Sequence, residues 1–139
     1  MKNLRSILAA LAVLLMATAG HAQQTGVRAT VPFNFVAGDR AYPAGEYVFS
    51  NRDVVLMITS AEEAKTEATL SQSCESLLPS ADTKLVFDNI GGNYFLRQIW
   101  VEGNSRGREL RISHTEIQLA KNHPNDSVEP VIVAANFSH

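Results

Sequence analysis

Residues 85–101 read LVFDNIGGNYFLRQIWV, and a fold can be built outward from this stretch in both directions along the chain. Two runs of β-branched, aromatic and aliphatic residues flank the pair Gly91-Gly92. Glycine adopts the positive φ angles of a tight two-residue turn without steric cost. The pattern therefore predicts a β-hairpin that turns on these two glycines.

The register of this turn determines which side chains share a face of the hairpin. Folding on the two glycines pairs Phe87 with Leu96 and Val86 with Arg97. One face then carries Leu85, Phe87, Tyr94, Leu96 and Trp100, and the other carries Val86, Ile90, Phe95, Ile99 and Val101. Because both faces are apolar, we expect other elements to cover both of them. Asp88 lies diagonally from Arg97, and we expect these two charges to neutralise each other.

The first 22 residues show the three parts of a secretory signal peptide. Lys2 and Arg5 give a positive start, residues 7–16 are apolar, and small residues precede the expected cleavage after Ala22. The apolar run is about half of the roughly 20 residues that a membrane-spanning helix needs. We therefore expect export to the periplasm or the extracellular medium, with no transmembrane span after cleavage.

Cleavage would leave residues 23–139, which are 117 of the 139 residues and the usual size of a single β-rich domain. Two of the 12 basic residues leave with the signal peptide and all 14 acidic residues remain, so the formal net charge falls from −2 to −4. This charge disfavours a nucleic-acid partner. Cys74 is the only cysteine, so no intramolecular disulfide can form, and we expect a buried thiol.

Upstream of the hairpin, alternating apolar residues predict further strands. Residues 31–35 place apolar side chains at a period of two, and Pro32 favours a position at the edge of a sheet. Residues 54–59 are apolar on both faces, which predicts a covered central strand. Residues 61–67 have helical propensity, but residues 64–71 alternate with a period of two, so we predict a turn followed by a strand.

Downstream of the hairpin, the sequence predicts one helix and a last strand. Residues 113–116, Ser-His-Thr-Glu, fit the capping box, in which the serine side chain accepts a hydrogen bond from the glutamate amide and the glutamate side chain reaches back. We expect a helix over residues 114–121 and a strand over residues 131–135. The whole pattern predicts a mainly all-β fold of about seven antiparallel strands, as a sandwich or a partly open barrel, with one short α-helix in the C-terminal half.

Several short motifs of the chain are shared with a family of secreted proteins. They are Val-Pro-Phe-x-Phe from Val31, Pro-Ala-Gly-x-Tyr from Pro43, the Leu-Val-Phe and Tyr-Phe-Leu runs of the hairpin, and Gly-Arg-Glu-Leu from Gly107. With the signal peptide, they make the chain resemble a family of small secreted β-proteins of soil bacteria that has no known function. The resemblance implies export and a β-rich fold, and it implies no reaction because these are turn and packing motifs.

A serine hydrolase is the least favoured of the three functions that we consider for this sequence. Residues 103–107 match the Gly-x-Ser-x-Gly pattern around Ser105, and Asp126 or Glu129 and then His139 follow in the order of a hydrolase triad. That mechanism needs a helix directly after the serine, so that backbone amides form an oxyanion hole. The residues after Ser105 predict an extended segment instead, so we expect no enzymatic activity.

Three residues near the predicted helix are of types that bind metal ions: His114, Glu116 and His123. Positions two apart on a helix point away from each other, and His123 lies at the end of the helix. A metal site needs three or four convergent ligands. We therefore predict no metal site, and the sequence calls for no other cofactor.

Arg106, Arg108 and Arg111 concentrate positive charge on an acidic chain. Arginine suits carboxylates and phosphates, so these residues are candidates for binding an anionic glycan or lipid head group of the cell envelope. The alternative, which we favour, is a solvated turn whose charges pair with Glu102 and Glu109.

Since no motif specifies a reaction, the functional prediction rests on architecture and compartment. We expect a non-catalytic binding or structural module of the periplasm or cell envelope, with an unknown envelope component as its partner. The alternative is a lipocalin-like carrier that holds a small apolar ligand inside a barrel.

Overall fold

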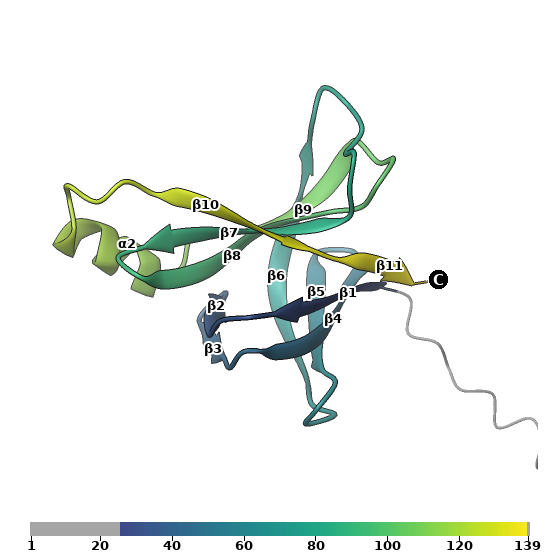
Figure 1. Ribbon diagram of the computed structural model, residues 1–139, viewed down its shortest axis with the longest axis horizontal. Coiled ribbons are helices and arrows are strands. Elements are labelled where there is room, and N and C mark those ends of the chain that lie inside the picture. The colour runs from purple at the N-terminus through teal and green to yellow at the C-terminus, as the bar shows by residue number, and fades with distance from the viewer. Residues whose placement is uncertain (1–25, 139) are drawn as a thin grey trace, which may run out of the picture.

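The computed structural model describes residues 26–138, a mainly β structure with one helix in that part of the chain (Figure 1). The helix, α2, spans His114–Asn122. The predicted signal peptide and His139 lie outside the described residues. The strands are β1 (Gly26–Val31), β2 (Phe35–Ala37), β3 (Arg40–Tyr42), β4 (Gly45–Arg52), β5 (Val55–Ser60), β6 (Thr66–Glu75), β7 (Lys84–Ile90), β8 (Asn93–Trp100), β9 (Arg106–Leu110), β10 (Glu129–Ala134) and β11 (Asn136–Ser138).

The strands join into a single open sheet. Hydrogen-bonded neighbours follow the order β10-β7-β8-β9-β6-β5-β4-β1-β11, while β2 pairs with β3 and runs parallel to β8. β10 and β11 form the two ends of this order, although only Ala135 separates them in the chain. The last segment of the chain therefore lies against both ends of the sheet, with β10 on β7 and β11 on β1 (Figure 1).

The mainly β prediction is confirmed, but the predicted number of strands is wrong, since residues 26–138 form eleven strands and not about seven. The open sheet gives no support to the barrel, and the predicted sandwich is not confirmed. Part of the difference arises because the strand expected at residues 31–35 is interrupted between β1 and β2, where Pro32 has no N–H to pair. A second break occurs at Gly38, whose φ of +61° turns β2 into β3.

Aromatic and aliphatic side chains fill the core between β2, β7 and β8 on one side and β1, β4 and β5 on the other. Phe35 joins the two sides, because its ring lies edge-on to both Phe87, at 5.5 Å between ring centres, and Tyr47, at 5.2 Å. The largest fully buried side chains are Tyr47, Phe35, Phe87, Leu56, Ile58, Leu85, Leu110 and Val31.

Two local predictions outside the hairpin are confirmed. A turn follows β5, closed by a hydrogen bond of 2.9 Å from the Ser60 amide to the Lys65 carbonyl, and β6 comes next. α2 begins directly after Ser113, as the capping box predicts, and ends one residue beyond the predicted boundary. Within residues 26–138, no helix has the length and apolar character that crossing a bilayer requires.

The β7–β8 hairpin forms where the two glycines predict it. Gly91 and Gly92 have φ angles of +57° and +84°, and Phe87 pairs with Leu96 as expected. The predicted partner of Val86 is wrong. Val86 pairs with Gln98, because the register shifts at this point and leaves Arg97 of β8 as an extra residue in a β-bulge.

The bulge exchanges the faces of the residues that follow it. Ile99 lies in the core and Val101 packs against it, whereas Trp100 faces away, which is the reverse of the prediction. A slip of one residue in a strand has this effect because side chains alternate with a period of two. The core face of the hairpin carries Leu85, Phe87, Tyr94, Leu96 and Ile99, and the outer face carries Val86, Asp88, Ile90, Phe95, Arg97, Gln98 and Trp100.

Candidate functional site

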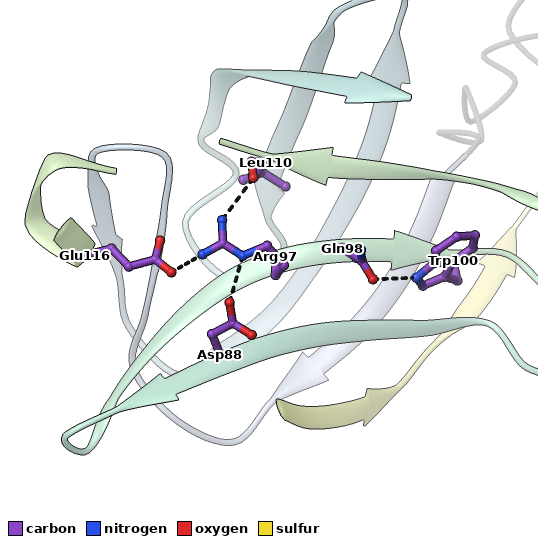
Figure 2. A network of polar contacts seen from close by, with 6 residues as sticks. All are labelled: Asp88, Arg97, Gln98, Trp100, Leu110 and Glu116. Carbon is purple, nitrogen blue, oxygen red and sulfur yellow. Dashed lines mark hydrogen bonds and ion pairs between the residues drawn. The ribbon is translucent and has the colours of Figure 1, made fainter. Parts of the chain in front are cut away.

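Arg97 is the centre of the polar contacts on the outer face (Figure 2). Its Nε donates a hydrogen bond of 2.7 Å to Asp88 Oδ2, and its Nη1 donates one of 3.1 Å to the Leu110 carbonyl. Its Nη2 donates to Glu116 Oε1. One guanidinium group therefore ties β8 to β7, to the end of β9 and to α2, and the predicted ion pair between Asp88 and Arg97 is confirmed.

Glu116 reaches Arg97 because of the way in which α2 begins. Ser113 is the N-cap, and its Oγ accepts a hydrogen bond of 3.2 Å from the Glu116 amide. This contact is one half of the predicted capping box. The Glu116 carboxylate contacts Arg97 in place of the Ser113 amide. Glu116, the glutamate of the predicted capping box, thus joins α2 to the sheet through its contact with Arg97.

The three charged side chains of this network are largely buried. Arg97, Asp88 and Glu116 keep 12%, 19% and 7% of their side-chain exposure. Burial lowers the pKa of Arg97, but its hydrogen bonds to Asp88 and Glu116 and their charges raise it by more, so the pKa lies above the ordinary value. Arg97 is therefore a permanent cation, and together with the two ion-paired carboxylates it carries a net charge of −1.

Asp88 and Glu116 each accept a hydrogen bond from Arg97 through only one of their two carboxylate oxygens. Arg97 contacts Asp88 at Oδ2 and Glu116 at Oε1, and no donor within residues 26–138 forms a hydrogen bond with Asp88 Oδ1 or Glu116 Oε2. Among residues 26–138, no fully buried side-chain oxygen lacks a partner, so each of these two oxygens keeps some contact with solvent. They are therefore free to accept a hydrogen bond from a bound molecule.

A groove of about 1040 Å³ lies over this network, between α2 and the strands β6, β7, β8 and β9; we call it the α2 groove. Three aliphatic side chains in it are unusually exposed, Ile112 at 59%, Val128 at 52% and Ile117 at 41%. The full lining is Gln72, Asp88, Ile90, Arg97, Glu109, Leu110, Arg111, Ile112, Glu116, Ile117, Ala120, Lys121 and Val128. The groove thus combines apolar walls with a charged floor.

The three predicted arginines do not form one cluster. Arg106 Nε lies 3.2 Å from Glu75 Oε1 in an exposed ion pair. Arg108 Nη2 donates to the carbonyl and to the hydroxyl of Ser71, at 2.9 Å each. The glutamates that we predicted as partners take part in neither contact. These two side chains are therefore engaged within the sheet.

Arg111 follows the end of β9 and has a different environment. It lines the α2 groove and is exposed, as is Lys121 on the last turn of α2. Neither side chain forms an ion pair with a residue of the described part of the chain. Of the three predicted arginines, Arg111 is the one that the structure places at the groove.

Ser105 and Asp126, two residues of the hydrolase alternative, lie at opposite ends of the β7–β8 hairpin. Ser105 is followed by β9 and not by the helix that the nucleophile turn of such a hydrolase requires. Asp126 lies beside Gly91 at the tip of the hairpin, whereas Ser105 lies beyond its other end. Glu129 is the first residue of β10, and His139 is outside the described residues.

The candidate metal ligands are engaged elsewhere. Glu116 is bound to Arg97, and His123 Nδ1 lies 3.3 Å from Asp126 Oδ2. In the part of the chain that the structure describes, no three His, Cys, Asp or Glu side chains converge on a point that could hold a metal ion. His114, the first residue of α2, is exposed.

Cys74 on β6 is partly exposed, and not buried as we expected. Burial of the sulfur and the negative charge of Glu109 raise the pKa of its thiol. The thiolate is the nucleophilic form of cysteine, so a raised pKa favours an unreactive thiol.

Comparison of the chain with protein-family models, with curated proteins and with solved structures found no match. The resemblance to secreted proteins of soil bacteria therefore rests on its sequence motifs. The floor of the α2 groove was not among the predicted binding residues. A signal for it exists, because the consecutive polar residues Arg97 and Gln98 interrupt the apolar alternation of β8 at the bulge.

Proposed function

We propose that this protein is a non-catalytic binding module that receives its ligand in the α2 groove. The observation that carries the proposal is the exposure of Ile112, Ile117 and Val128 on the walls of one groove. Soluble proteins seldom expose clustered aliphatic side chains without a partner, and ligand sites are typically apolar grooves with a few polar groups.

A binding site on the surface is favoured over a carrier that holds its ligand inside the sheet. Fully buried side chains such as Phe35, Tyr47 and Phe87 occupy the interior. The volume of the α2 groove, about 1040 Å³, is at the upper end of the range for sites that bind small molecules, roughly 300 to 1,000 Å³. A small ligand with an apolar body therefore suits the groove, which is the alternative kind of partner that the sequence suggested.

The experiment measures binding of N-phenyl-1-naphthylamine, a neutral apolar dye whose fluorescence rises when it leaves water. We expect saturable binding to the wild-type protein and a loss of about tenfold or more in affinity for the double variant Ile112→Ser/Ile117→Ser, because both apolar walls are removed. A wild-type protein that binds no dye would contradict the proposal.

The matched control is Leu77→Ser/Leu78→Ser. These two leucines lie in the loop between β6 and β7, are at least as exposed as the groove residues, and do not line the groove. The control should keep the wild-type affinity for the dye. Equal losses in the two double variants would show that the dye reports general surface hydrophobicity.

We also infer that the module acts outside the cytoplasm, which follows from the predicted signal peptide. Mass spectrometry of the protein secreted by a bacterial host should find a chain that begins at Gln23. A chain in the cytoplasm that retains residues 1–22 would contradict the inference.

A further inference from the structure

The charges of the α2 groove are separated by depth. The floor holds Arg97 between two carboxylates, with a net charge of −1, and these side chains are at most 19% exposed. The cations Arg111 and Lys121 also line the groove, but they are exposed to solvent. Two carboxylates therefore lie deep in the groove, whereas Arg111, Lys121 and the partly exposed Glu109 lie nearer to solvent.

Depth decides which of these charges acts more strongly on a ligand. Charges in contact with bulk water are screened by salt and contribute little to binding. A partly buried charge acts in a lower effective dielectric, and a hydrogen bond to it is stronger than one between neutral groups. The floor, with Glu116 Oε2 and Asp88 Oδ1 open, should thus determine the charge of the bound group.

We propose that the α2 groove selects a small amphipathic cation, a molecule with an aliphatic body and a protonated amine. The aliphatic body packs between Ile112 and Ile117, and the ammonium group donates hydrogen bonds to the free oxygens of Asp88 and Glu116. The added charge brings the floor from −1 to neutral. This inference rests on the proposed function, since it names the ligand of the same groove.

An aliphatic ligand with an anionic head group fits the groove less well. Its carboxylate would meet the two free carboxylate oxygens at the floor, and like charges in a partly buried site repel each other strongly. It could pair with Arg111 and Lys121 only at the rim, where both cations are exposed and salt screens their charges.

Three ligands with the same eight-carbon chain test this proposal: octylammonium, octanol and octanoate. Each ligand is titrated at neutral pH into the wild-type protein loaded with N-phenyl-1-naphthylamine, and displacement of the dye measures its affinity. We expect octylammonium to bind about tenfold more tightly than octanol, the effect of one charge-assisted hydrogen bond, and octanoate to bind more weakly than octanol. Equal affinities for the three ligands would overturn the inference.

Two variants test whether the preference for the cation comes from the carboxylates at the floor of the groove. Glu116→Gln keeps an oxygen that accepts from Arg97 but removes one negative charge, so the preference should fall to about twofold or less. Asp88→Asn should have the same effect and serves as the second variant if Glu116→Gln unfolds. Arg106→Gln, which removes an exposed positive charge outside the groove, should keep the tenfold preference, and a loss as large as that in Glu116→Gln would overturn the inference.

These outcomes separate the inference from the proposed function. If the three ligands bind equally and Ile112→Ser/Ile117→Ser abolishes all binding, the groove is a binding site without a preference for cations. If the wild-type protein binds neither the dye nor any of the ligands, the proposed function itself fails.

Discussion

The core face and the outer face of the β7–β8 hairpin are made by the same two strands, yet they differ in almost every physical respect. The core face is aliphatic and aromatic, and it packs against the other half of the sheet. The outer face contains the network of Arg97 and forms part of the floor of an open groove. The bulge in β8 changes which residues reach each face, because Arg97 and Gln98 both lie on the outer face and Ile99 returns to the core.

The comparison shows how one hairpin supports both stability and a site. Apolar burial on the core face is non-directional and requires only shape and volume. The outer face instead depends on directional contacts that hold α2 beside the sheet. The predictions below test this division by changing one face at a time.

The largest losses in the free energy of unfolding are expected when a phenylalanine of either face is replaced by alanine. Phe87 is fully buried and its ring lies 5.0 Å from that of Phe33, so Phe87→Ala should lower the free energy of unfolding by about 4 kcal/mol. Phe95, on the outer face, is 2% exposed but lies outside the main core, and Phe95→Ala should cost about 3 kcal/mol. Urea denaturation measures both. A cost below about 1 kcal/mol for Phe95→Ala would mean that the outer face is open to solvent.

The next effect tests the network itself. Arg97→Met keeps most of the length of the side chain but leaves Asp88 and Glu116 unpaired in a largely buried position. We expect a loss of about 3 kcal/mol in the free energy of unfolding, since removal of one partner leaves an uncompensated charge.

Arg106→Met is the matched control for Arg97→Met, because Arg106 forms an exposed ion pair with Glu75. Exposed pairs contribute little, so this variant should stay within about 0.5 kcal/mol of the wild type. Similar losses in the two arginine variants would show that the burial of the network has no energetic consequence.

The elements that could be predicted from the sequence are those whose signals are local. The pair Gly91-Gly92 places a turn within two residues, and Ser113 and Glu116 place the start of a helix within four. Each signal acts through backbone geometry that neighbouring residues determine among themselves. For the same reason, the secondary structure around both positions was predicted correctly.

The network of Arg97 could not be predicted in this way, because its four members come from four elements of the chain. Glu116 satisfies the local capping pattern equally well whether its carboxylate returns to Ser113 or extends to Arg97. The choice depends on where α2 lies relative to β8, which no local pattern specifies. The bulge is similar, since the apolar residues that follow Arg97 fit either face of the hairpin.

Alkaline pH should destabilise the packing around Tyr42 and Tyr47 before it affects the ion pairs of Arg97. Burial, followed by a hydrogen bond to Glu67, raises the pKa of Tyr42, and burial also raises that of Tyr47. The folded state therefore favours the neutral phenols, so their contribution to the free energy of unfolding is complete below about pH 10 and is lost as the pH rises above the pKa that tyrosine has in the unfolded chain.

The expected slope above pH 10 is a loss of about 1.4 kcal/mol per pH unit for each tyrosine that the fold keeps protonated. Urea denaturation at several pH values should show a smaller slope for Tyr42→Phe than for the wild type. Arg97 remains charged throughout this range because its pKa is raised as well. An equal slope in Tyr42→Phe would contradict the assignment to this phenol.

The smallest effect concerns the attachment of α2. Ser113→Ala removes the N-cap hydrogen bond to the Glu116 amide, and loss of such a cap costs about 1 kcal/mol. Ser105→Ala is the control, because no hydrogen bond to the Ser105 hydroxyl is formed within residues 26–138, and it should change the free energy of unfolding by less than about 0.5 kcal/mol. Hydrogen exchange adds a local readout, since the Glu116 amide should exchange faster in Ser113→Ala while the amides of β7 and β8 keep their protection. Equal protection of the Glu116 amide in the two serine variants would mean that Arg97 alone holds the helix against the outer face.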